Sequence, residues 1–493
     1  MHRALKIPEV LDLICLHISP DRDREPSINA SRALARLAQT YTTLSEPALD
    51  TLWSFQNTVV HILDCMPTGF WSKIDRSLRR PILRTDWERP LFYTHRVRRI
   101  SCTDTSFPPA LNLSEVFEML RFSLPTQHLL PNLRSLTWLF NKTSDSSLPH
   151  ALLLFSPRIT QIVLGRFKSR THLTLLSALG GKCPALTDVR LIQAEIQDAS
   201  ESQTLGTPHI FDTAIPAPIL PVPKFIALQY LELKSASSQC MLTFVRNMSH
   251  YPLASLLINL SPPPDFASTV DIYVALEKYL PSTSLTLLSM TSNPASTPPG
   301  FWIDQPPLQI DEICHLFHFP NLTSVTLRPP TGFDLDDEDI LALSEAWPRV
   351  VDLSLGSCHL PRTTLRSLVF LAQHCLFLNT LELSLDASII PEMDQSLPKR
   401  IRQFSLVEWE VADSVLASSL LVARFLSGVF PSLDGIRTNM QDEENHDDGA
   451  AGVLKSRWME VEVALPVCHE MRYEERYWAQ KACYRSRSLS REL

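Results

Sequence analysis

Residues Val350 to Leu360 read V-V-D-L-S-L-G-S-C-H-L, and copies of this pattern recur along much of the chain. The template is an apolar residue, two spacers, a second apolar residue, one spacer and a third apolar residue. Leu353 and Leu355 are two positions apart, so on a strand both side chains point to one face. Cys358 stands where the chain would leave that strand and must satisfy free backbone groups. The stretch therefore predicts a strand followed by a turn.

The copies recur at quasi-regular spacing. Ten intervals cover the 300 residues between first positions 133 and 433, a mean of 30, with extremes of 23 and 42. The copies are Leu133/Leu136/Trp138, Ile159/Ile162/Leu164, Leu186/Val189/Leu191, Leu228/Leu231/Leu233, Leu253/Leu256/Ile258, Leu285/Leu288/Met290, Leu322/Val325/Leu327, Val350/Leu353/Leu355, Leu378/Leu381/Leu383, Ile401/Phe404/Leu406 and Leu433/Ile436. Proline often precedes a copy, at Pro131, Pro157, Pro184, Pro252, Pro320, Pro348, Pro398 and Pro431. Proline there would end a helix and begin an extended segment.

This periodicity resembles that of leucine-rich repeats, in which each unit supplies one strand and one return segment. Only two copies carry the Asn or Cys after the strand, at Asn141 and Cys358. We therefore expect an irregular array. The predicted fold class is α/β, with a leucine-rich-repeat solenoid over residues 96–440, built as a curved parallel sheet backed by helices. Val97, Ile100 and Cys102 would form its first strand.

Composition narrows the function classes. A net charge of −8 and a pI near 6.0 give no basic footprint for nucleic acid. No run of 18 apolar residues predicts a membrane span. Lys6, Glu9 and Asp12 interrupt any secretory signal, and the ten cysteines contain no C-x-x-C pair. We expect an intracellular protein, in the cytoplasm or nucleus, with no nucleic-acid or membrane partner.

Signatures of catalysis are absent from the sequence. The twelve glycines form no phosphate-binding loop or nucleophile elbow, and no H-E-x-x-H or clustered Cys/His ligand set occurs. Cys375 beside His374 could be a thiol nucleophile, but a packed repeat cysteine is the favoured interpretation. We expect no catalytic residue, no cofactor and no metal, so the chain is not predicted to be an enzyme.

The N-terminal region predicts three helices, over residues 4–18, 30–40 and 46–55. Ile7-Pro8-Glu9 is typical of a helix start, with proline in the first turn and an acid near the positive end of the helix. Val10, Leu11, Leu13, Ile14 and Ile18 cover more than one side of the first helix. A helix this apolar needs a core or a partner on most of its surface.

Residues 4–55 resemble an F-box, through Ile7-Pro8-Glu9-Val10-Leu11, Leu34 to Tyr41, Leu44 and Ala48 to Trp53. The resemblance implies a three-helix module, residues 1–60, that binds the Skp adaptor of a cullin-based ubiquitin ligase. The adaptor-binding residues that it implies are Leu5, Ile7, Pro8, Val10, Leu11, Ile14, Leu34, Leu37, Tyr41, Leu52 and Trp53. An F-box followed by degenerate leucine-rich repeats is similar to a fungal type of this family. The alternative is that the helices only cap the array.

Several segments lie outside the repeats. Residues 61–95 predict a helical linker, and the proline-rich stretches 206–223 and 294–307 predict exposed loops. Acids at 334–339 either bind calcium or cap a helix over 339–347. The missing glycine at loop position six favours capping. Residues 441–452 predict an acidic flexible loop, and 453–493 a terminal strand at 458–465 followed by a charged tail.

A binding function follows from these features. The chain would be the substrate-recognition subunit of an SCF-type ligase, and its repeats would bind an unknown protein target. By strand alternation the target-facing residues are Asp188, Arg190, Tyr230, Glu232, Lys234, Arg328, Asp352, Glu382 and Gln403. A ligase-independent repeat scaffold is the alternative, and an unrecognised enzyme is a third hypothesis.

Overall fold

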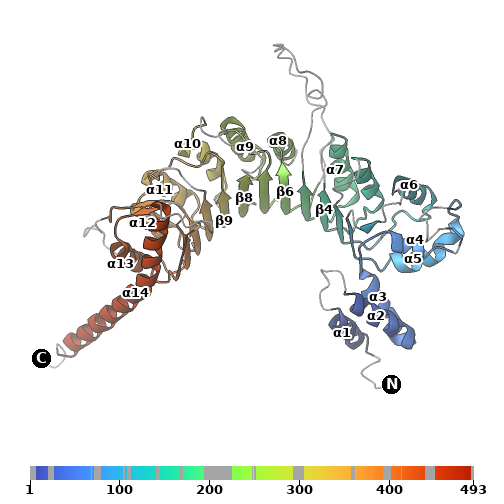
Figure 1. Cartoon of the computed structure of the whole chain (residues 1–493), viewed down its shortest axis with the longest axis horizontal. Coiled ribbons are helices and arrows are strands. Elements are labelled where there is room, and N and C mark those ends of the chain that lie inside the picture. Colours follow the sequence, from blue (N-terminus) through green and yellow to red (C-terminus); the bar gives the residue numbers. More distant parts are fainter. Residues whose placement is uncertain are drawn as a thin grey trace, which may run out of the picture. The chain divides into compact units, whose positions relative to one another are not determined.

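The computed structural model describes residues 7–19, 27–67, 69–70, 79–103, 106–107, 113–139, 145–165, 170–193, 225–246, 248, 251–292, 305–356, 361–391, 401–411, 414–438 and 450–489. The chain divides into two compact units, Met1–Cys240 and Met241–Leu493. Each unit is an α/β body with its own run of parallel strands (Figure 1). The fold class that the sequence predicts, a parallel sheet backed by helices, is confirmed in both units.

Unit 1 begins with three helices, as predicted: α1 (Pro8–Ile18), α2 (Ile28–Thr40) and α3 (Thr42–Ser54). Proline occupies the first turn of α1, and the Ser27 hydroxyl caps α2 by accepting from the Ala30 N–H at 3.1 Å. Cys15, Leu34 and Ala48 form a buried core, against which Ile18, Leu37, Ala38 and Leu52 pack. The three helices therefore bury one shared apolar face.

The sheet of unit 1 starts where α3 ends. Its strands follow the order of the sequence: β1 (Phe55–Gln56), β2 (Arg99–Thr103), β3 (Ser135–Leu139), β4 (Gln161–Gly165), β5 (Asp188–Ile192) and β6 (Tyr230–Ala236). The connections contain α4 (Val60–Asp64), η2 (Arg84–Trp87), α5 (Glu88–Thr94), α6 (Leu113–Ser123), η4 (Asp145–Leu153) and α7 (Arg170–Lys182). The predicted first strand at Val97 to Cys102 is present as β2, and its apolar residues are buried.

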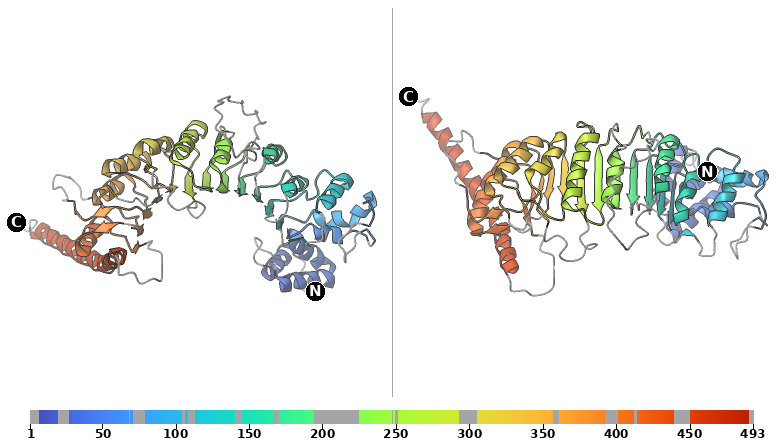
Figure 2. Two further views of the ribbon diagram at one scale, coloured as in Figure 1. Left: turned by 45° about the horizontal axis from the view of Figure 1, so that its top comes forward. Right: turned by 90° about the horizontal axis from the view of Figure 1, so that it is seen from above.

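Unit 2 is also built from parallel strands that alternate with helices. The boundary between the two units falls within α8 (Ser238–Arg246). Its strands are β7 (Ser255–Leu260), β8 (Leu287–Ser292), β9 (Ser324–Leu327), β10 (Asp352–Leu355), β11 (Thr380–Glu382), β13 (Glu408–Glu410) and β15 (Gly435–Arg437). A separate pair joins β12 (Asp386–Ala387) to β14 (Val415–Leu416). The helices α9 (Phe266–Tyr279), α10 (Ile310–Ile313), η6 (Cys314–His318), α11 (Asp337–Ala346), α12 (Leu365–His374) and α13 (Ser419–Val429) lie along one side of the strands (Figure 2). The last helix, α14 (Ala450–Leu489), lies across the end of the strands.

Each repeat is fixed to the previous one by a single backbone carbonyl that accepts two N–H groups. Thr323 O accepts from Val351 N at 2.7 Å and from Asp352 N at 3.0 Å. Val351 O accepts in the same way from Asn379 N and Thr380 N. The carbonyl occupies the position just before the strand, so it aligns the start of each strand with the next. The register that follows pairs buried residues, such as Leu353 with Leu381.

The proline turns that precede the strands carry a second ladder. In unit 1, Asn132 Nδ2 donates to His95 O at 2.7 Å, and Arg158 Nη1 donates to Asn132 Oδ1 at 2.5 Å. In unit 2, Asn321 Nδ2 donates to Thr283 O at 3.0 Å, and the Arg349 guanidinium donates to Asn321 Oδ1. Each of these Asn and Arg residues directly follows a proline, so the residue after the turn links neighbouring repeats.

One predicted copy has the wrong register. Phe404 is 61% exposed, whereas Leu406, Trp409 and Val411 are buried and face the core around β13. The template fits 406/409/411 as well as 401/404/406, because both triplets are apolar. In the structure the triplet 406/409/411 faces the core, since Trp409 pairs in register with Leu381. The remaining copies have their strands where predicted.

The predicted terminal strand at 458–465 is also wrong, because these residues lie in α14. Trp458, Val461 and Leu465 are buried, at spacings of three and four that fit a helix and not a strand. Trp458 packs edge-on against Trp409 with centroids 5.3 Å apart, and its Nε1 donates to Ser414 O at 2.8 Å. This helix therefore packs on the last strands of unit 2 and shields Trp409 of β13 from solvent.

The acids before α11 cap that helix. The Asp336 carboxylate accepts from the N–H groups of Glu338 and Asp339, and the Asp339 carboxylate accepts from Asp336 N at 2.9 Å. The capping interpretation is confirmed. Among the described residues no group of His, Cys, Asp and Glu is placed to hold a metal ion.

The repeat cysteines pack as apolar residues. Cys375 Sγ donates to Ser344 O and Trp347 O, and burial raises the pKa of its thiol to about 12. Burial raises the pKa of Cys183 and Cys240 to about 12 as well, and it raises that of Cys102. Cys375, which the sequence singled out, is therefore a buried and packed residue.

Some predictions fall on residues outside the described ranges. These are the turn residues Asn141 and Cys358, the loop 206–223, most of the loop 294–307, and positions 441–449 of the acidic loop. Residues 450–452 belong to α14.

Replacing Trp458 with Ala is expected to lower the free energy of unfolding by about 3–5 kcal/mol, the usual cost of removing a buried Trp. Urea denaturation followed by far-UV circular dichroism measures this change. Met459→Ala is the matched control, since Met459 is the next residue of α14 and is exposed; its effect should stay within about 0.5 kcal/mol. Equal effects of the two variants would contradict the packing described for α14.

Candidate binding surface

The residues that the F-box resemblance implies divide into a buried and an exposed set. Leu11 and Leu34 are buried, Leu37 and Leu52 pack on the core, and Val10 and Ile14 are half-buried. Trp53 stacks on Tyr93 with ring centroids 4.5 Å apart. Leu5 lies outside the described residues, and Pro8 is described only as the first residue of α1. Most of this set therefore holds the three helices together from inside.

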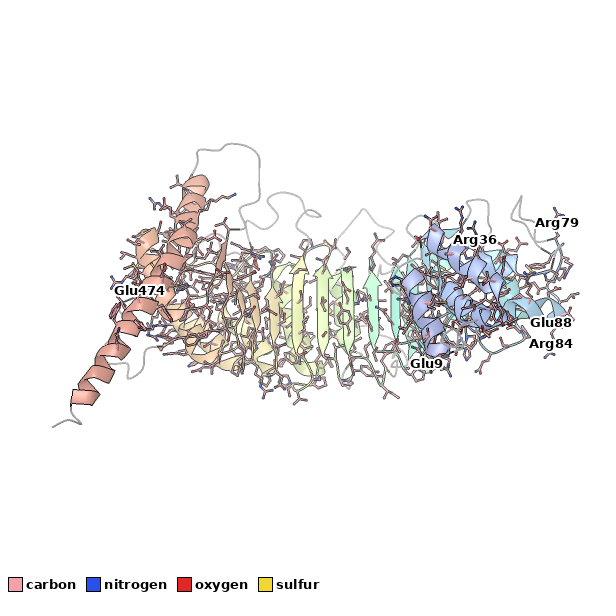
Figure 3. All side chains as sticks on the ribbon, turned by 90° about the horizontal axis from the view of Figure 1, so that it is seen from below. Glu9, Arg36, Arg79, Arg84, Glu88 and Glu474 are labelled. Atoms are coloured by element: carbon pink, nitrogen blue, oxygen red, sulfur yellow. The ribbon has the colours of Figure 1, made fainter. Side chains whose placement is uncertain are left out.

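Four large apolar side chains remain exposed on or beside α1 and α2. Ile7 directly precedes α1, Leu13 lies within it, Ile28 begins α2, and Tyr41 follows α2. Ile7, Leu13, Ile28 and Tyr41 are between 46% and 72% exposed. Glu9 and Arg36, labelled in Figure 3, lie at the surface of the same helices. Leu13 and Ile28 are absent from the residues that the sequence implied. Leu13 could have been found, since the first helix is apolar on more than one side.

A recess lies beside α2, α3 and α4. Its volume is about 360 Å³, and its lining residues are Ser31, Leu52, Trp53, Phe55, Gln56, Asn57, His61, Asp64 and Cys65. His61 Nδ1 is 2.8 Å from Gln56 Oε1, and Asp64 Oδ1 is buried without a hydrogen-bond partner. The N-terminal region from α1 to α4 therefore combines exposed apolar side chains with a concave, largely apolar recess.

Five of the predicted target-facing residues form one network on β5 and β6 of unit 1. Arg190 lies between two acids: its Nη2 is 3.1 Å from Asp188 Oδ2 and its Nε is 3.6 Å from Glu232 Oε2. Lys234 Nζ is 2.9 Å from Glu232 Oε1, and Tyr230 OH donates to Glu232 at 3.3 Å. The Arg190 guanidinium also lies 4.9 Å from the centroid of the Tyr230 ring. Strand alternation thus identified a real cluster of polar side chains.

Electrostatic effects in this network are consistent with paired charges. The hydrogen bond to Asp188 raises the pKa of Arg190. Burial raises the pKa of Tyr230, and the neighbouring Glu232 raises it further. Two adjacent residues at this end of the strands, Gln193 and Ser235, have left-handed φ values of 56° and 51°, which is uncommon for residues other than glycine. Gln193 N donates to Lys234 O at 2.8 Å, which holds this backbone in place.

A shallow hollow of about 230 Å³ lies on β9, β10, β11, β13 and β15 of unit 2. Arg328 Nη2 is 2.5 Å from Glu382 Oε2, and the Ser354 hydroxyl donates to the same oxygen. Thr380 Oγ1 donates to Asp352 Oδ1 at 2.5 Å. The structure therefore brings Arg328, Asp352 and Glu382 together, as the alternation predicted.

The hollow contains further charged residues that the sequence interpretation missed. Arg437 Nη2 is 2.8 Å from Glu408 Oε1, and Glu410 lines the hollow beside Glu382. Burial raises the pKa of Glu410, and so does the Glu382 carboxylate, whereas the two arginines of the hollow lower it. The template placed at 406/409/411 would have put Glu408 and Glu410 on the outward face.

Gln403 does not belong to this face, so its assignment was wrong. Its side chain is 2% exposed and makes hydrogen bonds only with backbone groups among the contacts described. Nε2 donates to Leu378 O at 2.6 Å, and Oε1 accepts from Leu406 N at 2.8 Å. Gln403 is a structural residue that joins two repeats.

No family model matches the chain, and no curated protein matches it. Among solved structures the chain is similar to one described as the crystal structure of the Rad7 and Elc1 complex in yeast, at 9% identity and a TM-score of 0.29, over 88% of this chain and 90% of that chain. No helix in the described residues combines the length and the apolar character that a membrane span requires.

Arg328→Ala is expected to lower the free energy of unfolding by about 1–2 kcal/mol, because it leaves the buried Glu382 carboxylate without its cation. The half-exposed position of Arg328 keeps the cost below that of a fully buried pair. The double variant Arg328→Ala/Glu382→Ala should recover part of the loss, as measured by urea denaturation.

Arg437→Ala serves as the control, since the pair that Arg437 forms with Glu408 is more exposed and should contribute less than about 0.5 kcal/mol. If Arg328→Ala proves as mild as this control, the Arg328–Glu382 pair does not order the hollow.

Proposed function

We propose that this chain is the substrate-recognition subunit of a cullin-based, SCF-type ubiquitin ligase. Its N-terminal helices would act as an F-box that binds the Skp adaptor, and its strands would bind a target protein. The observation that carries the proposal is one chain that joins a three-helix module with its own core to strands whose outward residues form polar, mixed-charge surfaces. Ubiquitin transfer would belong to other subunits, and this chain would supply proximity.

The adaptor side of the proposal rests on exposed apolar residues. Ile7, Leu13, Ile28 and Tyr41 add apolar surface to helices whose core is already filled. Large apolar side chains left exposed on a helical module are candidates for a protein interface. The recess next to Trp53 would receive a side chain of the adaptor.

The target side rests on the two strand surfaces. In unit 1 the network of Asp188, Arg190, Tyr230, Glu232 and Lys234 balances two acids with two bases. In unit 2 the hollow carries four carboxylates, of Asp352, Glu382, Glu408 and Glu410, against two arginines. Paired charges of both signs suit a protein surface, because they give specificity through electrostatic complementarity. The excess of carboxylates favours targets that present Lys or Arg to unit 2.

The double variant Ile7→Lys/Leu13→Lys is expected to lose the Skp adaptor. Affinity purification of the full chain from cells, with the adaptor quantified by mass spectrometry, should show a loss of at least about tenfold, since buried charges are strongly unfavourable in an apolar interface. Both side chains are exposed, so the melting temperature should not change.

Phe122→Lys is the control for surface charge, since Phe122 is an exposed apolar residue of α6 outside the three helices. The F-box assignment would be ruled out if the native chain does not copurify with the adaptor. It would also be ruled out if the double variant still copurifies with the adaptor.

A ligase-independent repeat scaffold is the second candidate, and one observation favours it. Strand β1 pairs with β2, and the buried Arg96 side chain contacts two acids of α3, with Nη2 2.5 Å from Glu46 Oε2 and Nη1 bonded to Asp50. The three helices are therefore attached to the sheet as a cap would be. Under this candidate the Ile7→Lys/Leu13→Lys variant leaves the whole set of recovered partners unchanged.

A further inference from the structure

Helix α14 has two apolar faces. One packs on α13 and the last strands through Trp458, Val461 and Leu465. The other is exposed: its side chains are between 51% and 76% accessible. They are Val453, Met459, Val463, Val467, Met471, Tyr477 and Trp478. With 3.6 residues per turn, these positions fall on the side of the helix roughly opposite Trp458. A helix that is apolar on two faces needs two partners.

Arg472 makes hydrogen bonds from α14 to α13, and Tyr473 and Arg476 line a recess with Ser427 of α13. Arg472 Nη2 donates to Arg424 O at 2.6 Å, and its Nε donates to Ser427 Oγ at 2.8 Å. After this residue, Tyr473, Glu474, Tyr477 and Trp478 are exposed. The helix continues past α13 to Leu489 (Figure 1), and Glu474 is labelled on this part in Figure 3. The helix therefore continues beyond Arg472 with Tyr477 and Trp478 exposed.

The exposed face has an aromatic centre. Tyr477 and Trp478 meet edge to face with centroids 5.7 Å apart. Lys481 Nζ lies 5.7 Å from the centroid of the first ring and 5.2 Å from that of the second. Two adjacent aromatic residues and a cation thus form one compact cluster on the exposed side of α14.

Charges on either side of this centre are arranged symmetrically with opposite sign. Glu474 lies as far before the midpoint of Tyr477 and Trp478 as Lys481 lies after it, and the same holds for Glu470 and Arg485. When a helix is turned end over end about that midpoint, positions 474 and 481 exchange places, and so do 470 and 485. Glu470, Glu474 and Lys481 are exposed on α14, on the side opposite Trp458.

We propose that α14 pairs antiparallel with α14 of a second copy of this chain, about a two-fold axis between Tyr477 and Trp478. In this arrangement the aromatic clusters of the two copies meet at the axis, and each Glu474 faces Lys481 of the other copy. A two-fold interface of this kind uses the same surface on both chains. A parallel pair would instead place Glu474 against Glu474. The face that packs on α13 points away from the axis, so pairing leaves each body intact.

The test is a charge exchange measured by analytical ultracentrifugation of the full chain, from about 1 to 100 μM, the range of small interfaces. The native chain is expected to approach twice the 55.8 kDa of one copy. Glu474→Lys and Lys481→Glu each place like charges opposite one another and should weaken association by at least about tenfold. The double variant Glu474→Lys/Lys481→Glu should restore it, because opposite charges face again.

Restoration by the double variant is specific to this arrangement. Positions 474 and 481 are seven residues apart on one helix, too far for the pairs that form at three or four residues, so the two side chains do not compensate within a chain. Glu475→Lys is the matched control, since Glu475 is exposed but lies off this face, and should not change the association. Far-UV circular dichroism confirms equal helix content.

A chain that stays monomeric to about 100 μM overturns the proposal, and so does a double variant that remains as weak as its parents. The first result would mean that a different protein, or none, covers this face.

Discussion

The structure depends on one carbonyl group per repeat. Each accepts two N–H groups from the start of the next strand, as Thr323 O does from Val351 and Asp352. Because one acceptor serves two donors, the strand cannot shift by one residue without leaving a backbone group unpaired. A shift would also turn every side chain to the other face. The burial of Leu353 beside Leu381 and the exposure of the polar residues between them therefore follow from the same contact.

That alternation makes the two sides of the sheet independent. The inward side is nearly uniform and apolar, so it sets stability. The outward side carries Arg190 between Asp188 and Glu232 in unit 1, and Arg328 beside Glu382 in unit 2. Substituting an outward residue changes the binding surface while the inward packing stays in place. The pairing of Arg328 with a buried carboxylate is an exception, since there the outward charge also contributes to stability.

Much of this could be predicted from the sequence, and the failures have clear physical causes. Leu353 and Leu355 predicted strand, face and register correctly, because residues two apart on a strand share one face. At 401–411 two overlapping triplets compete, and only the burial of Trp409 and the backbone bonds of Gln403 decide between them. At 458–465 apolar and acidic residues alternate as in a strand, yet Trp458, Val461 and Leu465 fit a helix. The ladder from Asn132 to Arg158 depends on contacts between repeats, which a single repeat does not reveal.

Burial of the repeat cysteines has a consequence for how this protein can be followed in solution. Cys183, Cys240 and Cys375 have thiol pKa values raised to about 12 by burial, so almost no thiolate exists at neutral pH in the closed state. An alkylating reagent reacts with each of them mainly when its own repeat opens. The alkylation rates at successive cysteines therefore report local breathing at separate places along the chain, without any introduced probe.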